Sequence, residues 1–94
     1  MMKAAIVIPV TRPDHLTLCL DRLMQQTFPH SEFEIILIKD SQQVLQLNDT
    51  DIRITEIEEN GLHPGLRRNL AVKITKAEIL AFLDDDTAPS KDWL

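Results

Sequence analysis

The sequence predicts an α/β fold with three layers, in which helices cover both faces of a mainly parallel sheet of about four strands. Three short apolar runs, at residues 3–10, 33–38 and 78–83, are rich in Ile, Val, Leu and Ala. Such continuous runs are typical of strands that are buried on both faces. Helical patterns follow the first run and precede the last one. The resulting order β-α-β-β-α-β favours right-handed crossover connections between parallel strands.

The first strand and first helix have clear boundaries. Residues 3–10 form the strand, which Pro9 ends. Residues 13–27 form an amphipathic helix, because apolar side chains recur along one stripe. The members of this stripe are Leu16, Cys19, Leu20, Leu23 and Met24. Thr11 and Pro13 stand where a helix cap and a first-turn proline are favoured. Cys19, on the stripe, is expected to be a small buried hydrophobic residue.

The remaining elements are predicted in the same way. Residues 33–38 form a second buried strand, and the polar residues 41–50 form a short helix or a loop. Residues 51–57 alternate apolar and charged side chains, which is typical of a half-exposed strand at a sheet edge. A second helix begins at Pro64, and residues 78–83 form the fourth strand. Trp93 is expected in the core. An open edge on the fourth strand would expose apolar surface and favour self-association.

Length and composition limit the classes of protein that the chain can represent. Its 94 residues correspond to a single domain, residues 1–94. Its net charge of −5 argues against binding to nucleic acid or to an anionic membrane. The sequence has no apolar run long enough to span a membrane and no signal-peptide pattern. With one cysteine there is no internal disulfide. We therefore expect a cytoplasmic protein without a transmembrane segment, which would reach a membrane surface only through partners.

The most distinctive motif is the run Asp84-Asp85-Asp86, directly after the fourth predicted strand. Three successive carboxylates repel one another, and a divalent cation relieves that repulsion. Hard oxygen ligands suit Mg²⁺ or Mn²⁺, usually together with the phosphates of a ligand. On an extended backbone Asp84 and Asp86 point to one side and can share one ion. The alternative is an acidic turn in contact with solvent.

Other polar residues follow the ends of the first two strands. Thr11 and Arg12 follow the first strand, and Asp40 follows the second. The carboxyl ends of parallel strands meet at one edge of the sheet, where ligands of open α/β sheets bind. Asp40 could bind a base or ribose, or it could cap a following helix. Arg68 lies near the start of the helix that begins at Pro64. It could bind a phosphate, or it could be an ordinary surface charge.

Three blocks of the chain together resemble family 2 glycosyltransferases of the GT-A fold. They read V-I-P…R-P-D-H-L…Q-T-F-P…F-E-I-I-L-I-x-D, then G-L-H-P-G-L-R-R-N-L-A, then E-I-L-A-F-L-D-D-D-T-A-P-S-K-D-W-L. The resemblance covers residues 5–94, essentially the whole chain. It implies the Rossmann-like, nucleotide-sugar-binding half of that fold, which would be truncated after the D-x-D motif.

The resemblance also implies roles for individual residues. Pro9, Thr11 and Arg12 match the nucleotide-binding segment after the first strand, although this chain is one residue shorter there. Asp40 matches the aspartate that contacts the nucleotide base, and the position before it is Lys39 instead of a second aspartate. Arg68 matches the arginine of an R-N pair near the diphosphate.

The same resemblance implies a metal-dependent glycosyl transfer. Asp84, Asp85 and Asp86 match the D-x-D motif, so Asp84 and Asp85 are expected to contact the nucleotide sugar. Asp86, with Asp84, is expected to bind Mg²⁺ or Mn²⁺. The implied donor is a UDP-, GDP- or dTDP-sugar. No residue of this chain matches the general base that activates the acceptor.

Two other functions fit the same residues. The chain could be a non-catalytic or degenerate nucleotide-binding module that lacks the acceptor half. It could also be a phosphatase with an aspartate nucleophile, which uses a D-x-D motif as well. That motif normally follows the first strand, whereas here it follows the fourth. The phosphatase is therefore the weaker of the two alternatives.

Overall fold

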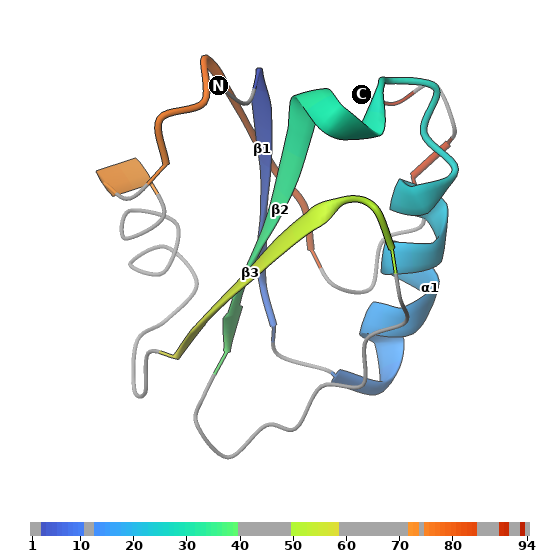
Figure 1. Cartoon of the computed structure of the whole chain (residues 1–94). Coiled ribbons are helices and arrows are strands. Elements are labelled where there is room, and N and C mark those ends of the chain that lie inside the picture. Colours follow the sequence, from blue (N-terminus) through green and yellow to red (C-terminus); the bar gives the residue numbers. More distant parts are fainter. Residues whose placement is uncertain are drawn as a thin grey trace.

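The fold is a four-stranded sheet with a helix packed on one face (Figure 1). A computed structural model describes residues 3–10, 13–39, 50–58, 72–73, 75–84, 89–90 and 93. Strand β1 is Ala4–Pro9, helix α1 is Pro13–Met24 and the short 3-10 helix η1 is His30–Glu32. They are followed by strands β2 (Phe33–Lys39), β3 (Arg53–Glu58) and β4 (Ile79–Phe82). The four predicted strands are thus confirmed.

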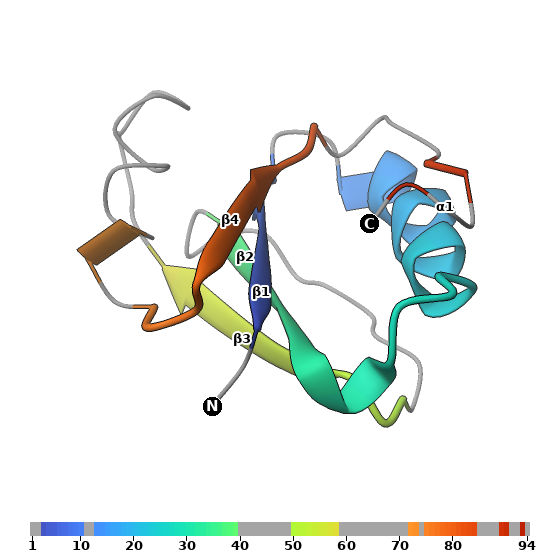
Figure 2. The ribbon, with the colours of Figure 1, turned by 90° about the horizontal axis from the view of Figure 1, so that it is seen from above.

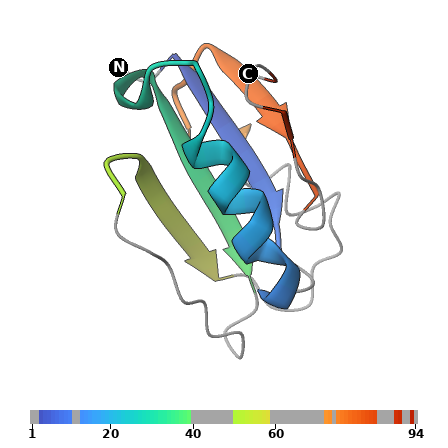
Figure 3. The same cartoon turned by 90° about the vertical axis from the view of Figure 1, so that its right-hand side faces the viewer.

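All four strands are parallel, and their order across the sheet is β3-β2-β1-β4. Figure 3 shows the strand arrows pointing the same way, with α1 in front of the sheet and running roughly along the strands. The chain moves outward from β1 through β2 to β3 and then returns to the other side of β1 to form β4. The boundary between β1 and β4 is therefore the switch point of the topology, where open α/β sheets bind ligands.

The larger part of the core lies between α1 and one face of the sheet. The helix contributes the predicted stripe, in which Leu16, Cys19, Leu20 and Leu23 are buried. Alternate strand residues meet it from β1 and β2, including Ile8 and Leu37, and Leu83 joins them directly after β4. The alternation follows from the pleat of a strand, which sends successive side chains to opposite faces. The apolar side chains that recur every 3.6 residues along the helix thus pack against those that recur every two residues along the strands.

The opposite face of the sheet carries a smaller core. Ala5, Val7, Ile36 and Ile38 are buried there. The segment that leads into β4 is attached to this face, because the hydroxyl of Thr75 donates a hydrogen bond of 3.1 Å to Oε1 of Glu34 in β2. The helix predicted from Pro64 onward lies outside the described residues, apart from 72–73, which are helical (Figure 2).

Two element boundaries and the burial of one residue differ from the sequence prediction. Helix α1 ends at Met24 and not at residue 27, because the next amides form tight bonds: N–H of Gln25 bonds to Arg22 O, and N–H of Gln26 to Leu23 O, each at 3.2 Å. Strand β3 runs two residues later than expected at its start, and residues 41–49 lie outside the described ranges. Trp93 was expected in the core, but 38% of its surface is exposed.

Strand β4 forms an edge of the sheet, as predicted, and pairs with β1 alone among the described strands. Its Ile79 and Phe82 are large apolar side chains with exposures of 51% and 42%. Self-association through this edge stays a prediction. Among the described residues, no helix combines the length and the apolar character that a membrane crossing requires.

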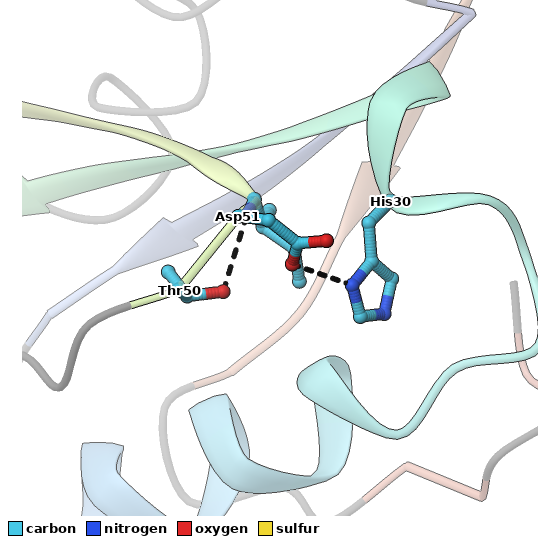
Figure 4. Close-up of polar contacts among 4 residues, drawn as sticks. His30, Thr50 and Asp51 are labelled. Atoms are coloured by element: carbon cyan, nitrogen blue, oxygen red, sulfur yellow. Dashed lines mark hydrogen bonds and ion pairs between the residues drawn. The ribbon is translucent and has the colours of Figure 1, made fainter.

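A polar contact joins the amino ends of β2 and β3 (Figure 4). Nδ1 of His30 lies 2.8 Å from Oδ1 of Asp51. Beside it the amide of Ile52 donates to the hydroxyl oxygen of Thr50 at 3.1 Å. The hydrogen bond with His30 is the main cause that lowers the pKa of the Asp51 carboxyl below its ordinary value of 3.8. The chain thus stabilises the ionised form of Asp51 when it folds.

This contact predicts a pH dependence of stability at the acid end. A carboxyl whose pKa is lower in the folded state stabilises that state above its unfolded pKa, and the contribution is lost as the pH falls through the folded pKa. The difference in unfolding free energy between the native chain and Asp51→Asn should therefore be constant near neutrality and shrink below pH 3.8. Urea unfolding across this range measures it. Asp21→Asn, with the same charge change, is the control, and a difference that stayed constant down to pH 2 would contradict the interpretation.

Candidate functional site at the carboxyl edge of the sheet

Four described residues mark the carboxyl edge of the sheet. Pro9 ends β1, Lys39 ends β2, Glu58 ends β3 and Asp84 follows β4 by two positions. Pro9 pairs with Ile38, and Lys39 pairs with Glu58, so the first three strands end at nearly the same level. Val7 and Phe82 form the last pair of the β1–β4 ladder, and Pro9 and Asp84 each lie two residues beyond a member of that pair.

Pro9 separates β1 from β4 at this edge. The amide of Leu83 donates to Val7 O at 3.1 Å, whereas the amide of Val10 donates to Ile38 O at 2.8 Å. At this end of β1, the backbone N–H and C=O groups of odd-numbered residues therefore point toward β4, and those of even-numbered residues point toward β2. The next donor toward β4 would be the nitrogen of Pro9, which carries no hydrogen. The β1–β4 ladder must stop there, while the β1–β2 ladder continues, so the two strands can part at the switch point.

Asp84 is exposed, and its backbone is held against α1. Sγ of Cys19, which is fully buried on the helix, lies 3.9 Å from the carbonyl oxygen of Asp84. This is a weak hydrogen bond from a thiol. It orients the backbone of Asp84 toward the helix while the residue remains exposed to solvent. The Cys19 prediction, a small buried residue, is confirmed.

A second contact, made by a residue just after α1, reaches the same part of the chain and was not predicted from the sequence. Nε2 of the buried Gln26 donates a hydrogen bond of 2.6 Å to the carbonyl oxygen of Ser90. Glutamine is usually a surface residue, so its type gave no indication of burial. The two signals available were its place at the end of the helical stripe and the Pro89-Ser90 turn after the aspartates.

The ammonium group of Lys39 is compensated by two carboxylates of β3. Its Nζ lies 3.6 Å from Oε1 of Glu58 and 3.9 Å from Oε1 of Glu56. The side chain of Lys39 is 12% exposed, so this charge is largely shielded from solvent. The lysine immediately before Asp40 therefore joins β2 to β3 at the carboxyl edge.

The structure brings two of the predicted site residues to the switch point. Pro9 and Asp84 lie there, on either side of the boundary between β1 and β4. The other predicted site residues lie outside the described ranges: Thr11, Arg12, Asp40, Arg68, Asp85 and Asp86. Within the described ranges no three His, Cys, Asp or Glu side chains are grouped so that they could hold a metal ion. Of the run of three aspartates, these ranges contain Asp84 alone.

A parallel sheet with a switch point beside its first strand is typical of open α/β domains. The comparison with known families is more specific. Residues 5–94 match the family described as glycosyl transferase family 2, and the chain belongs to that family. Membership decides against the phosphatase alternative.

Individual relatives cover the whole chain. It is 31% identical over 102 aligned positions to the poly(ribitol-phosphate) beta-N-acetylglucosaminyltransferase TarS of Staphylococcus aureus. It is 36% identical over 94 positions to a poly(ribitol-phosphate) beta-glucosyltransferase of Bacillus spizizenii. These alignments include 100% and 90% of this chain but 18% and 15% of the two relatives. The chain therefore spans less than a fifth of the length of either protein.

Solved structures share the fold. The crystal structure of S. aureus TarS in complex with UDP superposes with a TM-score of 0.77 at 28% identity, over 97% of this chain and 29% of that one. A mannosyltransferase from Pyrobaculum calidifontis, in complex with GDP-Man and Mn²⁺, gives a TM-score of 0.77 at 17% identity over 95% of this chain and 29% of that one. The GT-A fold predicted from the sequence is thereby confirmed.

Proposed function

We propose that this chain binds the nucleoside diphosphate of a nucleotide sugar at the carboxyl edge of its sheet, as the donor-binding part of a glycosyltransferase. One observation supports the proposal above all. In a chain of this family, Pro9 ends β1 and Asp84 follows the adjacent strand β4 by two positions, and the missing N–H of the proline ends the ladder between these two strands. A diphosphate bound there would lie across the ends of β1 and β4.

In this proposal each predicted residue has a defined part. Asp40 accepts hydrogen bonds from the base, since it follows β2 directly. Thr11 and Arg12, which follow β1 after Val10, contact the nucleoside. Arg68 donates to the diphosphate, where a guanidinium group can form two parallel hydrogen bonds. Asp85 contacts the nucleotide sugar next to the metal.

The metal proposal depends on the chemistry of the donor set. Successive carboxylates are hard oxygen ligands and fit Mg²⁺ or Mn²⁺, with Asp84 and Asp86 as the ligands. Asp84 is exposed at the end of β4 and therefore accessible to an ion. When bound, such a cation offsets the negative charge that develops on the leaving diphosphate. Arg68 would act on the same charge from the protein side.

We propose a UDP-sugar as the donor. Structures of TarS contain UDP and UDP-GlcNAc, and TarS is the nearer of the two structural relatives, at 28% against 17% identity. GDP, present as GDP-Man in the mannosyltransferase structure, is the appropriate comparison nucleotide. The general base for the acceptor remains unassigned.

The proposal predicts that UDP and Mn²⁺ together stabilise the chain. A ligand that binds the folded state alone and is present at about 100 times its Kd adds about 2.7 kcal/mol. For a domain of this size that raises Tm by about 10–20 °C. Differential scanning fluorimetry of the 94-residue chain measures it, with UDP plus Mn²⁺, UDP plus EDTA, and GDP plus Mn²⁺ as arms.

We expect the largest rise with UDP plus Mn²⁺ and a much smaller one with EDTA. A chain whose Tm is the same in all arms would refute nucleotide binding. A non-catalytic module would show the same binding as an enzyme. Release of UDP from UDP-GlcNAc, measured in the same preparation, separates these two functions.

A further inference from the structure

We propose that Gln26 is a positioning residue for the metal and diphosphate site, because it holds the chain beyond the three aspartates against helix α1. The inference rests on the proposed function above and assigns a role to a residue outside the predicted site. Gln26 lies just after α1, and 5% of its surface is exposed. A buried amide costs free energy unless its polar atoms are hydrogen-bonded, so its partners identify its role.

The amide nitrogen of Gln26 donates to two backbone carbonyls. One is Arg22 O, at 3.3 Å, in the last turn of α1. Arg22 O also accepts a hydrogen bond of 3.2 Å from the amide of Gln25, so the Gln26 side chain adds a second bond at the end of the helix. The other is Ser90 O, at 2.6 Å and 64 positions away in the sequence. One side chain thus connects the end of α1 to the segment after β4.

Ser90 is fixed from both sides. Its carbonyl oxygen also accepts a hydrogen bond of 3.0 Å from the amide of Trp93, which closes a turn. The neighbouring Pro89 is buried. The Gln26 bond therefore attaches a turn that already has local structure and does not merely order a loose chain end.

The other end of the same segment is also held by α1, through the contact of Cys19 Sγ with Asp84 O at 3.9 Å. Cys19 lies on α1, and Gln26 lies two residues beyond its end at Met24. Residues 84 and 90 are thus held by α1 and by the residue that follows its last turn, and the segment between them carries the proposed metal ligand Asp86.

In this proposal the anchors at residues 84 and 90 fix the two ends of the segment and thereby limit where the carboxylate of Asp86 can lie. Metal and diphosphate sites require ligand placement within a fraction of an ångström, and residues that support the ligands are needed to achieve it. Loss of such a support typically weakens metal binding by about 10–100-fold. The base and ribose are expected near the ends of β1 and β2, whereas the two hydrogen bonds of the Gln26 amide nitrogen go to Arg22 and Ser90. Its loss should therefore affect the diphosphate end of the ligand selectively.

The test compares two ligands in the full 94-residue chain. Gln26→Met keeps the length of the side chain and removes both donated hydrogen bonds. Gln25→Met changes the exposed neighbouring glutamine and is the matched control. Isothermal titration calorimetry gives Kd for UDP with Mn²⁺ and for UMP without metal, at a temperature where circular dichroism shows each variant folded. We expect Gln26→Met to weaken UDP–Mn²⁺ binding about tenfold or more and UMP binding less than about twofold. Gln25→Met should change neither.

Each other outcome overturns the proposal. Equal weakening of both ligands would mean that Gln26 supports the fold in general, and unchanged binding of both would mean that the tether has no role. If the native chain binds neither ligand, the proposed function fails as well, which distinguishes that failure from failure of the tether alone.

A measurement on the native chain covers the case in which Gln26→Met does not fold. Saturation with UDP and Mg²⁺ should shift the NMR signals of the Gln26 side-chain amide and slow its exchange with water. The side-chain amide of Gln25 is the internal reference and should not change. Nucleotide binding without any response at Gln26 would overturn the proposal.

Discussion

Replacing Asp86 with alanine should abolish the rise in Tm that UDP and Mn²⁺ produce. The expected loss is the whole shift of about 10–20 °C, because a cation that bridges protein and diphosphate cannot bind tightly through the remaining carboxylate. Without the ion, the diphosphate would also face the negative charges of Asp84 and Asp85. Removal of one ligand thereby converts an attractive site into a repulsive one.

The control for this variant is Glu78→Ala. Glu78 is exposed and directly precedes β4, so it lies at the opposite end of the same strand from Asp84. It loses the same charge as Asp86→Ala and should keep the full ligand-induced shift. An equal loss in both variants would mean that net charge, and not a defined site, controls binding. A full shift in Asp86→Ala would remove Asp86 from the metal site.

Replacing Phe33 with alanine should destabilise the chain more than any surface change. Phe33 is fully buried at the start of β2 and packs edge-on against Phe28, with ring centroids 6.0 Å apart. The ring of His30 lies on it at 5.8 Å, also edge-on. Truncation of a buried phenylalanine costs about 3–5 kcal/mol, which is a large part of the roughly 5–15 kcal/mol that stabilises a typical domain. We expect Tm to fall by about 12 °C or more.

Leu18→Ala provides the comparison for this second variant. Leu18 lies on α1 and is 55% exposed, so its truncation should change stability by no more than about 0.5 kcal/mol. Urea unfolding of both variants measures the difference. Similar losses in the two variants would mean that the face of the sheet under α1 is not the main core.

The strands were predictable from the sequence because each is a short apolar run. The apolar run of β2 predicted both where the strand lies and that it is buried on two faces. A parallel strand that is covered on both faces carries apolar side chains on both, so polar and apolar residues do not alternate along it. The alternation in β3 likewise placed it at the edge of the sheet. These patterns involve only neighbouring residues, so they can be recognised in the sequence alone.

The contacts that shape the candidate site were not predictable in this way, because they join residues far apart in the chain. Gln26 and Ser90 are separated by 64 positions, and nothing in either residue type indicates the other. The end of α1 at Met24 depends on tight turns and on the Gln26 side chain, whereas periodicity alone extended the helix to residue 27. Trp93 was expected in the core, but 38% of its surface is exposed.

The candidate site itself was predictable at the level of the sheet edge. Parallel strands bring their carboxyl ends together, so polar residues after β1, β2 and β4 had to share one edge. Pro9 ends the β1–β4 ladder and not the β1–β2 ladder. This role could be recognised only from the strand register, which cannot be read from the sequence.

The central claim is that a metal-bound nucleoside diphosphate binds at the carboxyl edge beside β1 and β4. The most direct measurement is paramagnetic broadening of backbone amide signals by Mn²⁺ in the presence of UDP. The two ends of a six-residue strand are about 20 Å apart, so the method can distinguish them. The account predicts broadening at Val10, Lys39 and Asp84, with sharp signals at Glu32 and Asp51. Broadening centred on the amino ends of the strands would contradict it.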